Sequence, residues 1–161
     1  MIGYTLESVI NEQYFYCGKL DSESLGTLKI KFSNGHEFIF DCDGDGESLK
    51  IQKGSFHGKG ILESDFEKKQ YRWKENQFLS NQVLKKLGKT IYIYVELLTN
   101  HYGTYQSGCK IEFESGDYLY IWTILSDNIF YMLNGTPPYH KKEGLTFKLT
   151  DVKTIHNSIN K

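Results

Sequence analysis

The sequence lacks the features that define several large protein classes. Alanine is absent, Arg72 is the only arginine, and the only prolines are Pro137 and Pro138. Because arginine is the side chain best suited to bidentate contacts with phosphate and guanine, its scarcity argues against direct nucleic-acid binding. No window approaches the roughly 20 apolar residues of a membrane span, and the first residues do not resemble a signal peptide. We therefore expect a cytoplasmic protein without a membrane segment.

The three cysteines, Cys17, Cys42 and Cys109, do not form a disulfide framework or a zinc knuckle. Three thiols cannot all pair within the chain, and no two have the short spacing of a zinc site. We expect reduced, mostly buried thiols and predict no metal and no cofactor. With 161 residues and a net charge of −1, the chain fits a single domain, 1–161.

An internal repeat is the strongest pattern in the sequence. Residues 28–54 align without a gap on residues 109–135, at an offset of 81 (110 − 29). The identical pairs are Lys29 and Lys110, Ile30 and Ile111, Phe32 and Phe113, Gly35 and Gly116, and Gly54 and Gly135. Upstream, Leu6, Val9, Tyr14 and Tyr16 align with Leu84, Leu87, Tyr92 and Tyr94 at an offset of 78 (84 − 6). Similarity at a fixed spacing indicates duplication, with a loop three residues longer in the second half.

Each half is predicted to contain a short helix followed by four antiparallel strands. Turns at 33–35 and 114–116 join two alternating strands in each half, and short third strands are expected at 48–52 and 129–133. We expect a final strand at 145–149, and a helix or a strand within 64–82. The predicted fold is α+β, predominantly antiparallel β, built as a pseudo-symmetric internal duplication with halves near 4–63 and 82–150. Two independent subdomains are the alternative.

The two copies agree on one strand face and differ on the other. Alternation puts Phe38, Phe40, Leu119 and Ile121 on a shared apolar face. The opposite face is acidic in the first copy and aromatic in the second, where it carries Tyr118, Tyr120 and Trp122. A covering helix or strand would make these aromatics part of a core. If they are exposed, they would form a docking face, since tyrosine and tryptophan are enriched at interfaces.

The acidic segment contains Asp41, Asp43, Asp45 and Glu47. Its aspartates and Gly46 match the first positions of a calcium loop, but Gln52 stands where a bidentate glutamate closes the cation shell. We therefore interpret it as the end of an acidic hairpin. Such a cluster is either a solvated turn or a surface that steers a basic partner toward the chain.

No enzymatic motif is present. The five histidines are scattered, and the sequence has no phosphate loop, no paired-histidine metal motif and no nucleophile elbow. His57 and His140 each follow a repeat glycine and would approach one another if the halves met about a twofold axis. We predict that the protein is not an enzyme, with acid–base chemistry by this pair as an alternative.

A small, neutral, aromatic-rich α+β chain with an acidic hairpin is similar in general style to the cytoplasmic bacterial immunity proteins that block a cognate toxin. The resemblance implies a protein-binding inhibitor that acts by occlusion, with a partner such as a basic nuclease domain. The acidic residues Asp41, Asp43, Asp45 and Glu47 would face the toxin, and exposed members of Tyr118, Tyr120 and Trp122 would anchor it. A small-molecule or carbohydrate-binding module that uses the aromatic face is the alternative.

Overall fold

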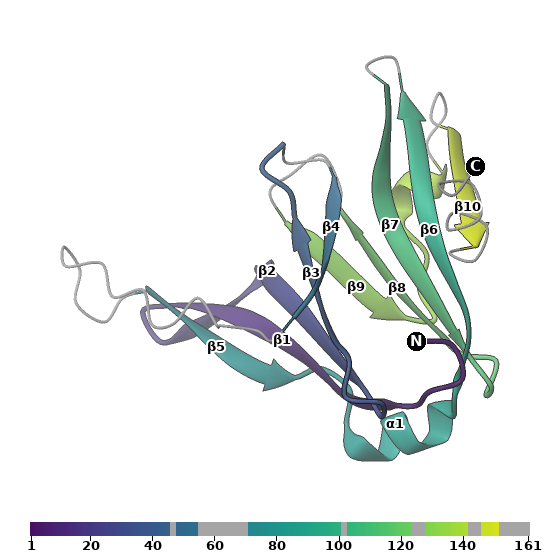
Figure 1. Cartoon of the computed structure of the whole chain (residues 1–161). Helices are drawn as coiled ribbons and strands as arrows, with labels where there is room; N and C mark the ends of the chain where they lie inside the picture. The colour runs from purple at the N-terminus through teal and green to yellow at the C-terminus, as the bar shows by residue number, and fades with distance from the viewer. Residues whose placement is uncertain (46–47, 55–70, 101–102, 124–127, 142–145, 152–161) are drawn as a thin grey trace.

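Two antiparallel sheets of five strands make up most of the protein (Figure 1). The computed structural model describes residues 1–45, 48–54, 71–100, 103–123, 128–141 and 146–151. The first sheet has the order β4-β3-β2-β1-β5 and contains β1 (Leu6–Tyr16), β2 (Lys19–Phe32), β3 (Glu37–Cys42), β4 (Leu49–Lys53) and β5 (Tyr71–Gln77). The second has the order β10-β6-β7-β8-β9 and contains β6 (Thr90–Asn100), β7 (Gly103–Phe113), β8 (Tyr118–Thr123), β9 (Ile129–Leu133) and β10 (Thr146–Asp151). The predicted antiparallel β character is confirmed.

The two predicted hairpins form with matching registers. Ile30 lies opposite Phe38 in the first sheet, and Ile111 lies opposite Leu119 in the second. Each turn uses a glycine with a positive φ, 80° at Gly35 and 86° at the corresponding turn glycine, a conformation that costs glycine little. The offset of 81 residues read from the sequence therefore holds for β2, β3, β7 and β8.

The helix expected at Leu6–Val9 is wrong, because these residues begin β1. The offset upstream of the hairpins is 84 (90 − 6), not 78, because Leu6 lies opposite Phe32 just as Thr90 lies opposite Phe113. The extra three residues belong to the first half, where β2 has 14 residues and β7 has 11. An alignment of apolar residues alone does not show where the three extra residues lie, because bulges in β1 shift its alternation of apolar and polar residues.

The match between Gly54 and Gly135 is also corrected. Gly54 N donates to Glu37 O at 3.2 Å, and the corresponding bond in the second sheet runs from Asn134 N to Tyr118 O at 2.8 Å. Asn134 has the positive φ, 58°, which asparagine tolerates better than most residues. Asn134 is thus the structural counterpart of Gly54.

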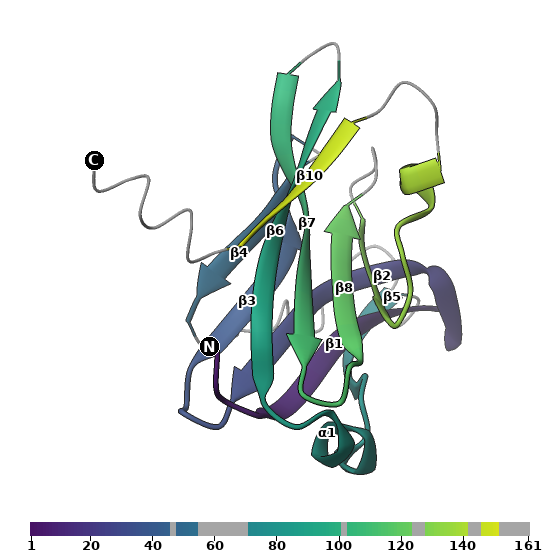
Figure 2. The same cartoon turned by 90° about the vertical axis from the view of Figure 1, so that its right-hand side faces the viewer.

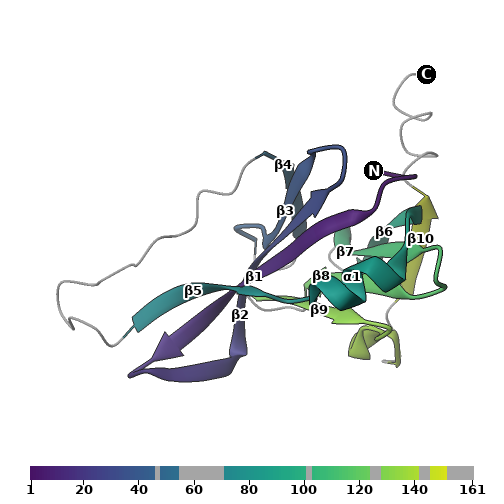
Figure 3. The same ribbon diagram turned by 90° about the horizontal axis from the view of Figure 1, so that it is seen from below.

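The helix α1 (Asn81–Leu87) connects the sheets, as the second half of the sequence predicted. Its first turn is capped by Ser80, whose Oγ accepts a bond from Val83 N at 3.3 Å. Leu84 and Leu87 are buried, and the helix lies at the end of the molecule where the sheets converge (Figures 1 and 3). Gly88, with a φ of 72°, follows the helix and allows the chain to turn into β6.

The main core lies between the inner faces of the two sheets. β2 packs against β9, and β4 packs against β7. The predicted inward face is confirmed, since Phe40, Leu119 and Ile121 are buried in this core and Phe38 packs against it. The other fully buried members of the core include Val9, Leu28, Ile30, Phe32, Ile111 and Phe113.

Corresponding residues also meet where the two sheets join. Thr5 and Lys89, which each precede the first strand of a sheet, form an isolated antiparallel bridge. Ser33 N donates to Thr5 O at 2.9 Å, and Glu114 N donates to Lys89 O at 2.9 Å. The two sheets therefore share strand order, hairpin register and junction hydrogen bonds. Within the described residues, no helix has the length and hydropathy needed to span a bilayer.

We expect Cys17 and Cys109 to react at very different rates with a thiol reagent. Cys109 is buried in the core, and burial raises the pKa of its thiol to about 12, so almost no thiolate forms near neutral pH. Cys17 is exposed. Titration with a chromogenic disulfide should label Cys17 rapidly and Cys109 only after unfolding. Rapid labelling of Cys109 in the folded chain would contradict its placement.

Candidate functional site: a buried carboxylate and the aromatic face around it

The outer face of the second sheet is rich in aromatic side chains. Cross-strand pairing places Tyr94, Lys110, Tyr120 and Met132 in one row across β6, β7, β8 and β9. The next row along the strands contains Glu96, Gly108, Trp122 and Phe130. The 3-10 turn η1 (Pro138–Lys141) lies beside β8 on this side of the sheet (Figure 2). One half of the outer face is consequently covered and the other is open.

Glu96 lies beneath η1 and is completely buried. Its Oε1 accepts bonds from Ser107 Oγ at 2.6 Å and from the hydroxyl of Tyr139. Its Oε2 accepts a bond from the hydroxyl of Tyr120 and lies 2.5 Å from Nε2 of His140, which donates when the ring proton is on that nitrogen. Four donors therefore surround one carboxylate, an arrangement that offsets the cost of burying its charge.

Local sequence features place these donors over the carboxylate. Pro137 and Pro138 restrict the backbone at the start of η1, and His140 N donates to Pro137 O at 3.2 Å. Tyr139 is buried and His140 is largely covered, with 14% of its side chain exposed. Gly108 lies opposite Glu96, and a Cβ there would come within 3.3 Å of Glu96 Oε1. The absence of a side chain at this position makes room for the network.

The network changes the acidity of its two tyrosines in the same direction. Burial is the largest cause that raises the pKa of the Tyr120 hydroxyl, followed by the hydrogen bond to Glu96 and the negative charge of that carboxylate. The same causes raise the pKa of Tyr139. Ionising either hydroxyl would remove a donor from Glu96 and place two negative charges side by side.

A spectrophotometric titration of the chain's 12 tyrosines should therefore be biphasic. We expect Tyr120, Tyr139 and the buried Tyr131, whose pKa is also raised by burial, to stay protonated at about pH 11 while the fold persists. A pKa that is higher in the folded state favours folding below the ordinary tyrosine pKa of about 10, and this stabilisation decreases as the pH rises further. Urea titrations at increasing alkaline pH should show the decrease. A single ionisation step in the folded protein would contradict this prediction.

Of the three predicted aromatic anchors, two are buried and one remains accessible. Tyr120 and Trp122 are 2% and 4% exposed and pack with Leu98 and Tyr139 in a second apolar cluster. Their rings are inclined by 77°. They therefore form neither an exposed docking pair nor a flat sugar-binding platform, because η1 covers them. Tyr118 is half-buried and remains accessible at the edge of this cluster.

The open half of the face, which we call the tyrosine face, surrounds Lys110. Its members are Tyr92, Tyr94, Tyr118, Lys110 and Met132. Lys110 Nζ lies 4.5 Å from the centre of the Tyr118 ring and 2.5 Å from Glu112 Oε1. The rings of Tyr92 and Tyr94 stack with centres 5.9 Å apart, and Tyr92 and Met132 are 45% and 51% exposed. Of these residues, the sequence predicts only Tyr118 as a partner-binding residue, since its apolar pattern pairs Tyr92 and Tyr94 with Tyr14 and Tyr16 in the wrong register.

The predicted acidic surface lies on the first sheet and includes lysines. Asp41 lies opposite Lys50, and Glu37 lies opposite Lys31. Asp43 and Asp45 are exposed in the turn, where Asp43 Oδ1 accepts a bond from Gly44 N at 2.9 Å and Asp45 Oδ1 accepts one from Ser48 N at 2.8 Å.

These carboxylates order the turn, and no group of three potential ligands for a metal occurs among the described residues. Glu47 lies outside the described residues.

Of the two histidines that were expected to approach each other, His57 lies outside the described residues. His140 instead contacts Glu96, a residue that sequence reasoning overlooked. The signal was present, since Glu96 is the single charge in the strand sequence of β6, TIYIYVELLTN. A lone acid within an apolar strand is worth testing as a buried, hydrogen-bonded group.

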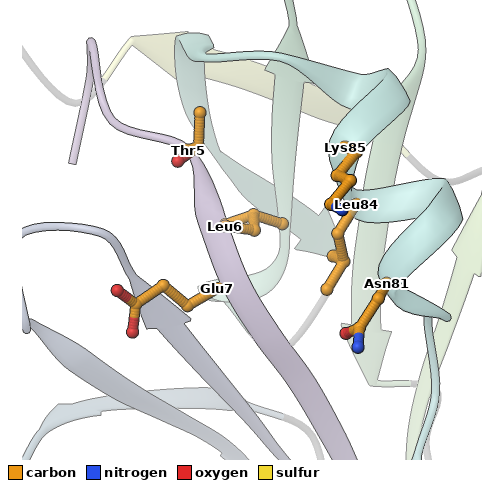
Figure 4. A pocket seen from close by; sticks show the side chains of 6 residues that line it. All are labelled: Thr5, Leu6, Glu7, Asn81, Leu84 and Lys85. Carbon is orange, nitrogen blue, oxygen red and sulfur yellow. The ribbon is translucent and has the colours of Figure 1, made fainter.

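Two surface crevices flank the junction between the sheets. One, of about 410 Å³, lies between the start of β1 and α1 (Figure 4) and is lined by Thr5, Leu6, Glu7, Asn81, Leu84 and Lys85. The other, of about 370 Å³, lies at the start of β6 and is lined by Ile2, Gly3, Lys89, Thr90, Ile91, Tyr92 and Glu114. Neither lining includes a residue of the Glu96 network. Comparison with protein-family models, curated proteins and solved structures found no match.

Proposed function

We propose that this chain is a cytoplasmic protein-binding inhibitor, of the kind represented by bacterial immunity proteins, and that it blocks its partner by occlusion. The tyrosine face carries this proposal. It presents Tyr92, Tyr118 and Met132 beside Lys110, and aromatic residues and methionine are enriched at protein interfaces. Rigid β-strands below this face would limit the entropy lost on binding.

Internal duplication provides a rationale for this face. We propose that the two sheets descend from one unit, since they share strand order and junction hydrogen bonds. The buried residues Glu12 and Glu96 occupy corresponding positions in β1 and β6 at the offset of 84. The duplicated inner faces form one core, so the outer faces were free to diverge. The second sheet acquired the aromatic surface.

The partner proposed is a basic protein domain. Asp43 and Asp45 are exposed at the tip of the β3–β4 hairpin, where they would attract a positively charged surface during approach. The tyrosine face is near neutral at its centre because Glu112 pairs with Lys110. The acidic turn would therefore affect the association rate, and the tyrosine face would affect the lifetime of the complex.

The test is affinity capture from the native cell, followed by binding kinetics with the purified partner. We expect a basic protein whose own activity is lost at an equimolar ratio. Tyr118→Ala/Met132→Ala should raise its dissociation rate at least about tenfold, and Asp43→Lys/Asp45→Lys should slow association and weaken its dependence on salt. Tyr16→Ala, an exposed tyrosine of the first sheet, is the control. Unchanged rates in both double variants would contradict the proposed interface.

Acid–base catalysis is a second candidate, favoured by the contact between His140 and Glu96. A carboxylate that orients an imidazole is a recurring arrangement in general-base sites. A catalytic role is supported less well than inhibition, because each oxygen of Glu96 already has two donors. The two described crevices also lie away from this carboxylate. If binding to a partner survives His140→Gln unchanged, the network has a structural role in the inhibitor.

A further inference from the structure

The crevice at the start of β6, which we call the β6 crevice, is continuous with the tyrosine face. Tyr92 belongs to both surfaces, since it lines the crevice and its ring also stacks on that of Tyr94. Ile2 and Ile91 line the crevice as well, and Ile91 and Tyr92 are 38% and 45% exposed. A ligand in the β6 crevice would therefore contact an accessible aromatic ring and an apolar wall.

An exposed carboxylate is held in place at the wall of the β6 crevice. Oε2 of Glu114 accepts a bond from Lys89 N at 2.9 Å, and Glu114 N donates to Lys89 O at 2.9 Å. Gly88 lies against the same carboxylate, because a Cβ at this position would come within 2.8 Å of Oε2. None of the described salt bridges involves Glu114. Its negative charge is thus fixed at the crevice without an ion pair in the described part of the chain.

The corresponding crevice of the first sheet shows how the chain itself places a cation beside such a carboxylate. Glu7 lines the crevice beside α1 (Figure 4), and its Oε2 lies 2.9 Å from Nζ of Lys31. The counterpart of Lys31 in the second sheet is Glu112 at the offset of 81 (31 + 81), so an acid replaces this cation. Glu112 pairs with Lys110 on the tyrosine face. The β6 crevice therefore lacks the lysine that the first sheet provides.

We propose that the β6 crevice binds an arginine side chain of the basic partner, an inference that rests on the proposed function. The guanidinium stacks on the ring of Tyr92 and pairs with Glu114, and the methylene groups lie against Ile2 and Ile91. Long cationic side chains commonly bury their methylene groups against apolar surface in this way. Arginine suits the crevice better than lysine, because a planar guanidinium can stack on an aromatic ring and also pair with a carboxylate.

An NMR titration of the full chain with Nα-acetylarginine amide tests the site without the partner. We expect the amide signals of Ile91 and Tyr92 to shift, with an apparent dissociation constant on the order of 1 mM for a ligand of this size. Nα-acetylcitrulline amide has a similar shape without the positive charge and should bind at least about threefold more weakly. Signals of Ile30 and Ile111, which are buried in the core, should stay in place.

Variants of the crevice show which contacts carry the binding. Tyr92→Leu should weaken binding of the arginine amide about two- to fivefold, the range for an exposed cation–π contact. Glu114→Gln should remove most of the preference for arginine over citrulline, and Lys89→Gln, which removes a like charge from the crevice, should strengthen arginine binding. Tyr16→Leu and Glu75→Gln change exposed residues of the first sheet and should leave the affinity unaltered.

Two results would overturn the proposal. The first is equal affinity for the arginine and citrulline amides, and the second is an arginine affinity that neither Tyr92→Leu nor Glu114→Gln changes. These failures are distinguishable from failure of the proposed function. If a basic partner is captured but the two amides bind alike, the inhibitor proposal stands and the arginine site is wrong. If the arginine amide binds as expected but no basic partner is captured, the site is retained and the inhibitor proposal is wrong.

Discussion

Replacement of Glu96 by alanine should lower the free energy of unfolding by about 3–5 kcal/mol, the usual cost of removing one partner from a buried ionic network. The carboxylate is fully buried and accepts bonds from Ser107, Tyr120 and Tyr139, with His140 as a fourth neighbour. Without it, these donors would remain in a closed, largely apolar environment with no acceptor. Urea unfolding monitored by tryptophan fluorescence measures the loss.

Two variants show whether the effect comes from this network. Glu96→Gln retains one oxygen but turns an amide NH₂ toward two of the donors, so its loss should be intermediate. Glu112→Gln removes a half-buried carboxylate of the same sheet that pairs only with Lys110 among the described salt bridges, and it should cost less than about 1 kcal/mol. If Glu96→Ala lowered the free energy of unfolding no more than Glu112→Gln does, Glu96 would have to be exposed to solvent.

Phe32→Ala and Phe113→Ala should each cost about 3–5 kcal/mol, the usual range for truncation of a buried phenylalanine. Both rings are fully buried at the ends of β2 and β7. Their backbone groups are also equivalent, since Phe32 N donates to His36 O at 2.9 Å and Phe113 N donates to Asp117 O at 3.0 Å. Similar losses are expected because the two residues occupy corresponding places in one core.

The same unfolding experiment needs an exposed control. Leu20→Ala removes a side chain that is 49% exposed and should change stability by no more than about 0.5 kcal/mol. If one phenylalanine variant lost much stability and the other phenylalanine variant lost little, the two sheets would not contribute equally to the core. Calorimetry would then be expected to show two transitions in place of one.

The hairpins were predictable because their signals are local. Alternation of apolar and polar residues defines a strand face, and Gly35 and Gly116 supply the backbone conformation that the turns require. The start of β1 was mistaken for a helix because its partners are distant in sequence. Leu6 is a strand residue since it pairs with Phe32, and bulges in β1 hide the alternation that would have revealed it.

The covered and open halves of the aromatic face could not be distinguished from the sequence. Tyr118, Tyr120 and Trp122 alternate on one face of β8, and nothing in that strand shows that η1 covers only the last two. Glu96 is likewise far in the chain from Tyr139 and His140. Their meeting depends on β6 lying two strands from β8, and on two prolines that direct η1 back over the sheet.

The sequence by itself determined the antiparallel hairpins and their inward faces, because these properties depend on neighbours a few positions away. Only the tertiary structure decided which outer surface is buried, that acidic residues of the first sheet lie opposite lysines of the neighbouring strands, and that one glutamate is surrounded by four donors. These properties depend on strand register and on which segments cover a sheet. A change in register of a single residue would turn every side chain of a strand to the other face.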